Sequence, residues 1–133
     1  MVSTASTTFQ ALRGVRVLSL ALNLPGPAAL MRCQQMGATC TKLEPPAQAG
    51  AGSGDPMASY CPAAYDAMHS GIQHLQADLK TPTGQQTLHT ALESTDVLIT
   101  SFRPSALPKL GLAWDTLHTT YPALSQVAII GAP

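Results

Sequence analysis

The sequence predicts an α/β fold, with a mainly parallel, Rossmann-like sheet of about five strands and flanking helices. The first observation is that short apolar runs suited to buried strands alternate along the chain with segments whose apolar residues recur at helical spacing. The second is that glycine and proline mark the junctions between these segments. Strands that alternate with helices join into a parallel sheet through right-handed crossovers, and a ligand then lies at the carboxyl ends of the strands.

Several segments have the composition of strands. The first reads VRVLSLA, and the segment Leu24-Pro25-Gly26-Pro27 beyond it cannot continue a strand, because proline fixes the backbone and lacks an N–H donor. The predicted strands are residues 15–21, 38–43, 74–79, 96–100 and 125–130. The last of them is mostly apolar and is expected to be buried.

Helices are expected between the strands. Pro27 suits the first turn of a helix over residues 28–36, and Gly37 suits a left-handed cap at its end. Thr81 and Pro82 suit the N-cap and the first position of a second long helix. Shorter helical segments are expected at residues 57–69, 106–110 and 114–121.

The chain divides into a flexible tail, residues 1–10, and a single Rossmann-like domain, residues 11–133. Within the domain, residues 45–56 are rich in Pro, Gly and Ala and offer little side-chain anchorage, so a mobile loop or lid is expected there. The domain ends directly after a predicted strand, whereas a parallel strand normally feeds a further helix that covers it. We therefore expect a truncated domain; the alternative is a sheet that closes with its fifth strand.

The charge balance excludes two classes of partner. Seven basic and seven acidic side chains cancel, which removes the long-range field expected of a protein that binds nucleic acid or an anionic membrane. Only 11% of the residues are charged, while 45% are apolar. A surface so poor in charge favours contact with a partner, and we expect a homodimer or a higher homo-oligomer.

Neither a metal site nor a membrane segment is expected. Cys33, Cys40 and Cys61 form no CxxC pair, and the histidines show no ligand spacing beside them. The N-terminus lacks a basic stretch followed by a long apolar core, and no apolar run approaches the roughly 20 residues needed to cross a bilayer. These features predict a soluble, cytoplasmic protein.

Short motifs occur in a fixed order over nearly the whole chain. They are Leu12-Arg13-Gly14-Val15-Arg16-Val17-Leu18, Gly26-Pro27-Ala28, Gly37-Ala38, Lys42-Leu43-Glu44-Pro45, Gly54-Asp55, Ala77-Asp78-Leu79-Lys80-Thr81-Pro82-Thr83-Gly84, Asp96-Val97-Leu98-Ile99, Ser101-Phe102-Arg103-Pro104 and Leu110-Gly111-Leu112. In order and spacing these motifs resemble the N-terminal part of the family III CoA-transferases, the group that includes formyl-CoA transferase, carnitine CoA-transferase and α-methylacyl-CoA racemase.

The resemblance implies that coenzyme A or an acyl-CoA is the substrate and that this domain holds its adenosine diphosphate part. It also implies a dimer of two interlocked, ring-like chains, of which this chain supplies the first domain. In the family, positions like Asn23 and Leu24 line the adenine end. The positions that surround the rest of the nucleotide match Pro45, Ala77, Lys80, Ser101, Phe102 and Lys109.

The residues themselves are compatible with such a site. Phosphate groups bind cations and backbone N–H groups near helix starts. The cations close to strand ends are Lys42, Lys80, Arg103 and Lys109, although each also fits a solvated surface charge. Phe102 fits either an adenine-stacking ring or a core aromatic. The Gly26-Pro27 turn fits either a close approach of the nucleotide or a tight turn alone.

Three departures from the family pattern predict a weakened site. The family commonly has a turn with two cations where this chain has His69-Ser70-Gly71-Ile72. Pro45 stands where a basic residue is common, and Ser101 stands where an asparagine is common. Each charge-assisted hydrogen bond that is lost lowers affinity by about 1.5–3 kcal/mol.

The chemistry of transfer is expected to lie outside this chain. In the family a carboxylate attacks the thioester, and that aspartate lies beyond the point matching Pro133, as do the His and Asp of the racemase branch. The aspartates present fit turn, cap or strand-edge roles instead; they are Asp55, Asp66, Asp78, Asp96 and Asp115.

Two hypotheses therefore remain open. The chain is either the N-terminal, CoA-binding-type piece of a family III CoA-transferase, inactive alone, or a non-catalytic binding or oligomerisation module derived from it. A receiver domain would need an acidic cluster where the chain has Leu22-Asn23-Leu24. A nicotinamide-binding domain would need a GxGxxG motif after the first strand, and the chain has none.

Overall fold

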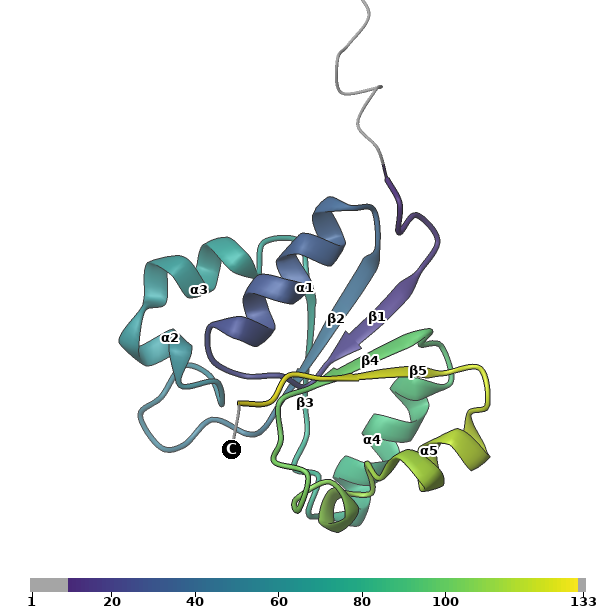
Figure 1. Ribbon diagram of the computed structural model, residues 1–133. Helices are drawn as coiled ribbons and strands as arrows, with labels where there is room; N and C mark the ends of the chain where they lie inside the picture. The colour runs from purple at the N-terminus through teal and green to yellow at the C-terminus, as the bar shows by residue number, and fades with distance from the viewer. Residues whose placement is uncertain (1–9, 132–133) are drawn as a thin grey trace, which may run out of the picture.

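The computed structural model describes residues 10–131, which form one parallel sheet with helices on both faces (Figure 1). The strand order is β3-β2-β1-β4-β5, and every neighbouring pair is parallel. The strands are β1 (Arg16–Ser19), β2 (Thr39–Glu44), β3 (Gln73–Gln76), β4 (Val97–Thr100) and β5 (Ser125–Ala128). The predicted fold class is confirmed. Most of the predicted tail, residues 1–9, lies outside the described part of the chain.

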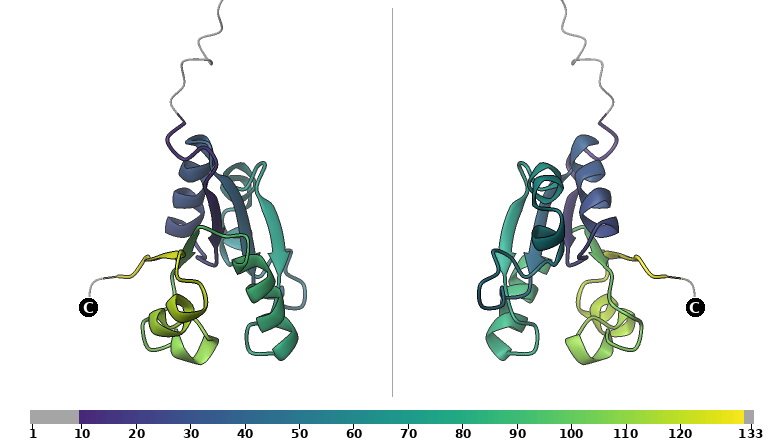
Figure 2. Two further views of the ribbon diagram at one scale, coloured as in Figure 1. Left: turned by 90° about the vertical axis from the view of Figure 1, so that its right-hand side faces the viewer. Right: turned by 90° about the vertical axis from the view of Figure 1, so that its left-hand side faces the viewer.

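The helices divide between the two faces of the sheet. They are α1 (Pro25–Gln35), α2 (Met57–Tyr60), α3 (Pro62–Met68), α4 (Pro82–Leu92), the 3-10 helix η2 (Pro108–Leu110) and α5 (Trp114–Thr120). Figures 1 and 2 show α1, α2 and α3 on one side and α4 and α5 on the other. None of the helices among residues 10–131 is long and apolar enough to cross a membrane; the cytoplasmic location stays a prediction.

Alternating side chains of the central strands build two separate cores. On the face covered by α4 and α5, Leu18 and Leu98 pack with Leu88 of α4. On the other face, Val17 and Ile99 pack with Leu30 of α1. Because successive strand residues point to opposite faces, one short apolar run supplies both cores at once.

Proline residues stand at the start of both long helices. At α4 the Thr81 hydroxyl accepts a hydrogen bond from the Gly84 N–H at 3.0 Å, which confirms the predicted N-cap. Helix α1 begins at Pro25, three residues before the predicted start. The prolines in its first turn have a backbone angle that already suits a helix, and the N–H groups that they lack need no partner there. Gly37 follows α1 with a positive φ of 101°, as predicted.

The turn from β1 into α1 depends on close packing at Gly26. A Cβ atom added there would overlap the side chain of Ala21 and lie 2.8 Å from its carbonyl carbon and oxygen. Only glycine therefore lets the start of α1 rest on the end of β1. Of the two interpretations of the Gly26-Pro27 turn, the structure supports the geometric one.

Two segments differ from what the sequence predicts, the first of them only in part. The second half of the 45–56 loop is anchored, because the side chain of Ser53 is hydrogen-bonded and that of Asp55 is completely buried. The sequence could not predict this anchoring, because the hydrogen-bond partners of these side chains are distant in the chain. The fifth strand is not buried: β5 is an edge strand, most of its residues are exposed, and Val127 is 48% exposed. An apolar strand is covered only where another element packs on it, and at this edge the described residues supply little.

Candidate functional site

A small pocket lies where the carboxyl ends of the first four strands meet. Its volume is about 160 Å³, and it is lined by Leu20, Leu22, Leu43, Pro45, Ala77, Asp78, Leu79, Lys80, Phe102 and Leu110. From the predicted nucleotide site, it brings together Pro45, Ala77, Lys80 and Phe102. These residues are far apart in the sequence and meet only because parallel strands end at the same edge.

The wall of this pocket is mostly apolar. Leu20, Leu43 and Ala77 belong to the core on the α4 face, so the pocket floor is continuous with the core. Phe102 is half-buried: it packs against the same core and also lines the pocket. The core interpretation of Phe102 is confirmed, and the adenine-stacking interpretation stays a prediction. A flat, apolar ring system is the kind of group that such a wall accommodates.

One cation and one carboxylate stand at the pocket. Lys80 is exposed, and among residues 10–131 its ammonium group makes no ion pair, so it is free to meet an anion. Asp78 is used locally: its carboxylate accepts a hydrogen bond from the Lys80 backbone N–H at 3.0 Å, and its carbonyl accepts one from the Thr81 hydroxyl at 2.8 Å. Asp78 thus has the turn role that the sequence predicts.

The Asn23–Leu24 turn borders this region without lining the pocket. Both residues are exposed, and Asn23 has a φ of 68°, in the left-handed region. The Leu22 N–H donates to the Ser101 hydroxyl at 3.1 Å, so Ser101 anchors this backbone from the end of β4. Pro25 and Pro27 both lack a backbone N–H group. The start of α1 therefore offers few hydrogen-bond donors to a phosphate group.

Arg103 and Lys109 also lie outside the pocket. Both are exposed; Arg103 follows the end of β4, and Lys109 lies on η2 beside Leu110, which does line the pocket. In the described part of the chain neither side chain takes part in an ion pair. They are therefore available to contact a ligand that extends beyond the pocket.

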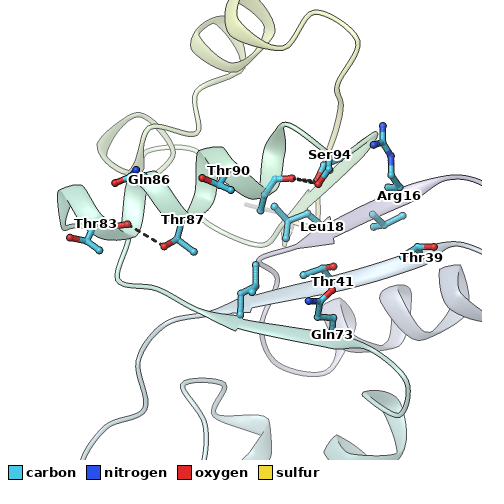
Figure 3. A pocket seen from close by; sticks show the side chains of 14 residues that line it. Arg16, Leu18, Thr39, Thr41, Gln73, Thr83, Gln86, Thr87, Thr90 and Ser94 are labelled. Atoms are coloured by element: carbon cyan, nitrogen blue, oxygen red, sulfur yellow. Dashed lines mark hydrogen bonds between the residues drawn. The ribbon is translucent and has the colours of Figure 1, made fainter.

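A larger pocket of about 620 Å³ lies elsewhere, between α4 and the face of β1, β2 and β3 (Figure 3). It includes Arg16, Thr39 and Gln73, the first residues of their strands, so it opens toward the amino ends. Its lining is rich in threonine and glutamine, and its cation, Arg16, is already paired with Asp96 at 3.0 Å. Ligands of open parallel sheets bind at the carboxyl ends, so the smaller pocket is the candidate for the predicted nucleotide site.

Lys42 cannot serve the nucleotide as the sequence suggested. Its side chain is completely buried on the face opposite Leu43, and it forms ion pairs with Glu44 at 3.0 Å and with Asp55. Its Nζ atom also lies 2.9 Å from Nε2 of His69. The expectation failed because Asp55 and His69 are 13 and 27 residues away along the chain, and no local pattern links them to Lys42.

The carboxylates around Lys42 are fully hydrogen-bonded. The Tyr65 hydroxyl donates to Glu44 Oε2 at 2.6 Å, and the Ser53 hydroxyl donates to Oε1 at 2.7 Å. Burial alone would raise the pKa of Glu44, but the hydrogen bonds from Tyr65, Ser53 and Lys42 outweigh it and hold this pKa below its ordinary value. Burial, together with the neighbouring Glu44 carboxylate, raises the pKa of Tyr65 to about 12.

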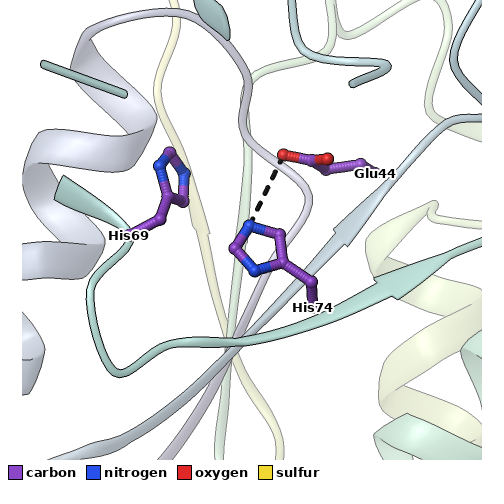
Figure 4. Close-up of side chains that lie close together, drawn as sticks. All are labelled: Glu44, His69 and His74. Carbon is purple, nitrogen blue, oxygen red and sulfur yellow. Dashed lines mark ion pairs between the residues drawn. The ribbon is translucent and has the colours of Figure 1, made fainter. Parts of the chain in front are cut away.

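Glu44, His69 and His74 point toward one another, and their ligand atoms lie within 4.8 Å (Figure 4). No pattern in the sequence predicted this group. His69 Nδ1 lies 2.6 Å from the Tyr65 carbonyl and so donates to it, which leaves Nε2 to accept from Lys42. Because the Lys42 ammonium already contacts Glu44 and His69, a cationic group fills the position that a metal ion would need. We interpret the group as part of an ion-pair network in which Glu44 and His69 are buried and His74 is exposed.

The fold and the pocket define the class of protein: a Rossmann-like α/β chain with a small apolar site at the carboxyl ends of its strands. Residues 12–131 match the model of CoA-transferase family III, and the chain belongs to that family.

Relatives and solved structures agree with this assignment. The chain is 32% identical to succinyl-CoA–D-citramalate CoA-transferase of Chloroflexus aurantiacus, over 88% of this chain and 30% of that protein. It is 33% identical to cinnamoyl-CoA:phenyllactate CoA-transferase of Clostridium sporogenes, over 89% of this chain and 30% of that protein. A hypothetical protein from Mycobacterium tuberculosis has a similar structure, with a TM-score of 0.81 and 28% identity over 93% of this chain and 34% of the other.

A CAIB/BAIF family protein from Brucella suis is similar too, with a TM-score of 0.79, 28% identity, and the same coverage of 93% and 34%. The chain thus spans about 30% of the length of the first curated relatives that it matches.

The buried network predicts a pH dependence of stability. Burial above all holds the pKa of His69 below its ordinary value of 6.5, so below that pH the unfolded chain binds a proton that the folded chain does not. The free energy of unfolding should therefore fall as the pH is lowered from 7 to 5. Further acid should lower it again, because the pKa values of Glu44 and Asp55 are also depressed on folding.

Urea denaturation at a series of pH values measures this effect. The variant His69→Gln should flatten the decline between pH 7 and 5, whereas His118→Gln, at an exposed position beside Trp114, should leave it unchanged. An unaltered slope in His69→Gln would contradict this account of the network.

Proposed function

We propose that this chain is the part of a family III CoA-transferase that holds the nucleotide portion of coenzyme A or of an acyl-CoA. The observation that carries the proposal is the meeting of Pro45, Ala77, Lys80 and Phe102 in one pocket at the carboxyl ends of the strands. These residues match the positions that surround the nucleotide in the family. The family membership of the chain and the rule for ligand position in parallel sheets support the same site.

The size of the pocket limits what it holds. At about 160 Å³ it is smaller than the roughly 300–1,000 Å³ that encloses a whole drug-sized ligand. In the proposal the apolar wall beside Phe102 receives the adenine ring, and Lys80 meets a phosphate group at the mouth. Asn23 and Leu24 stand outside the pocket at its adenine end, and the remainder of coenzyme A lies outside, near Arg103 and Lys109.

Transfer of coenzyme A between an acyl-CoA and a carboxylic acid needs a nucleophilic carboxylate at the thioester. Asp78 is the carboxylate that lines the pocket, and its hydrogen bond to the Lys80 N–H holds it in a turn. The proposal therefore assigns binding to this chain and assigns the nucleophile to a part of the protein outside it. The isolated chain should bind coenzyme A without exchanging thioesters.

Calorimetric titration of coenzyme A and of 3′,5′-ADP tests the binding half of the proposal. We expect a dissociation constant no tighter than roughly 100 μM, about 5.5 kcal/mol, because few cations face the pocket. Lys80→Ala should weaken binding about tenfold or more, since a charge-assisted contact is lost. Lys109→Ala should have a smaller effect, because Lys109 does not line the pocket.

Arg13→Ala is the matched control, because Arg13 is an exposed cation that precedes β1 and lies toward the opposite, amino edge of the sheet. Equal losses in Lys80→Ala and Arg13→Ala would indicate nonspecific attraction and contradict the site. No binding at millimolar coenzyme A would favour the interaction-module hypothesis. Acyl transfer by the pure chain would overturn the assignment of the nucleophile.

We also propose that the chain forms homo-oligomers through the edge of β5. This strand leaves one row of backbone N–H and C=O groups without a neighbouring strand among residues 10–131. Its Val127 is 48% exposed, and Ile130 just beyond it is 57% exposed. An apolar edge strand of this kind readily pairs with another chain.

Sedimentation velocity at micromolar concentration should show a species larger than the monomer. Val127→Lys should shift it toward the monomer, because a charge on an edge strand opposes pairing with a second edge. Ala123→Lys, which places the same charge at an exposed position in the turn before β5, should not. If the unaltered chain sediments as a monomer, association at this edge is ruled out.

A further inference from the structure

A carboxylate from a distant segment holds the turn between β1 and α1. Asp55 Oδ1 accepts hydrogen bonds from the backbone N–H groups of Asn23 and Met57, both at 3.0 Å. Its other oxygen forms an ion pair with the Lys42 ammonium. One side chain therefore connects the middle of β2, the start of α2 and the turn after β1.

The conformation of this turn needs such support. Asn23 is the one residue other than glycine in the described chain with a positive φ, 68°, a region that asparagine tolerates better than most side chains. The preceding N–H, that of Leu22, donates to the Ser101 hydroxyl at 3.1 Å. Two successive backbone N–H groups are thus held by acceptors from two other parts of the fold, which fixes the path of the chain at this point.

Asp55 and Lys42 act on this turn from a buried position. Both side chains are 0% exposed, and neither lines the nucleotide pocket. A buried carboxylate without a partner is strongly disfavoured, so the Lys42 ammonium is what allows Asp55 to remain an ionised acceptor. Leu20 and Leu22, which line the pocket, lie directly before the turn, so a change in its path moves the pocket wall.

We propose that Asp55, with Lys42 behind it, is a positioning residue for the nucleotide site: it fixes the Asn23 turn and thereby the shape of the pocket, without touching the ligand. This inference rests on the proposed function, since the pocket is the one assigned to coenzyme A. Loss of the carboxylate leaves the Asn23 N–H without its acceptor and lets the turn move away from the strand ends.

The test compares Asp55→Ala with Asp96→Ala, using two measurements. Asp96 is the comparison because its carboxylate also accepts a distant backbone N–H, that of Arg16 at 2.8 Å, and also pairs with a cation. Unlike Asp55 it is partly exposed, and it lies just before β4, at the amino edge of the sheet. Amide hydrogen exchange followed by NMR measures how strongly the Asn23 N–H is protected, whether or not a ligand binds. Calorimetry reports the affinity for coenzyme A.

Asp55→Ala should speed exchange at Asn23 and weaken coenzyme A binding, each by about tenfold or more, while Asp96→Ala changes neither. Asp55→Asn keeps an acceptor oxygen but loses the charge, so it should fall between the unaltered chain and Asp55→Ala. If Asp55→Ala fails to fold, Asp55→Asn is used in its place. The proposal would then be contradicted if Asp55→Asn had the same Asn23 exchange rate and the same affinity for coenzyme A as the unaltered chain.

The remaining outcomes separate the two proposals. Unchanged exchange at Asn23 in Asp55→Ala overturns the claim that Asp55 holds the turn. Faster exchange with unchanged affinity shows a structural role alone and overturns the positioning role. If the unaltered chain binds no coenzyme A, the proposed function fails and the positioning role fails with it, while the exchange result still decides whether Asp55 holds the turn.

Discussion

The burial of one ammonium group organises the carboxyl edge of this sheet. Lys42 is completely buried at the centre of β2, and a buried charge is tolerated only when it is paired and hydrogen-bonded. Glu44, Asp55 and His69 meet this need, and to do so they bring together the end of β2, the 45–56 loop and the end of α3. Removing one partner of such a buried pair costs about 3–5 kcal/mol, so these segments are held in one arrangement.

The same strand separates this charged network from the proposed nucleotide pocket. Along β2, Lys42 and Glu44 point toward α3, while Leu43 between them points to the other face and lines the pocket. The pocket is consequently apolar even though the charges lie one residue away on either side. What it can offer a phosphate comes from Lys80 at its mouth, which fits a site that contributes only part of the affinity for a large nucleotide.

The sequence predicted the features that depend on neighbouring residues and missed those that depend on distant ones. The parallel α/β fold, the Thr81 cap and the left-handed Gly37 follow from local patterns and were confirmed. The prediction for Lys42 was wrong because the local sequence around a lysine in a strand does not show whether its ammonium group contacts water or carboxylates from another segment. The exposure of β5 depends on what packs beside it, and local composition does not report this.

The candidate site was predictable to a similar extent. The resemblance named Pro45, Ala77, Lys80 and Phe102, and the fold brings them together. It also named Asn23 and Lys109, which lie outside the pocket; the sequence could not predict this, because a motif does not reveal where an exposed side chain points.

NMR shift mapping with 3′,5′-ADP tests the central claim most directly. The account predicts that the amides of residues 20–24, 77–80 and 101–103 shift. Shifts confined to the threonine-rich pocket beside α4, around Thr41, Thr87 and Thr90, would contradict it.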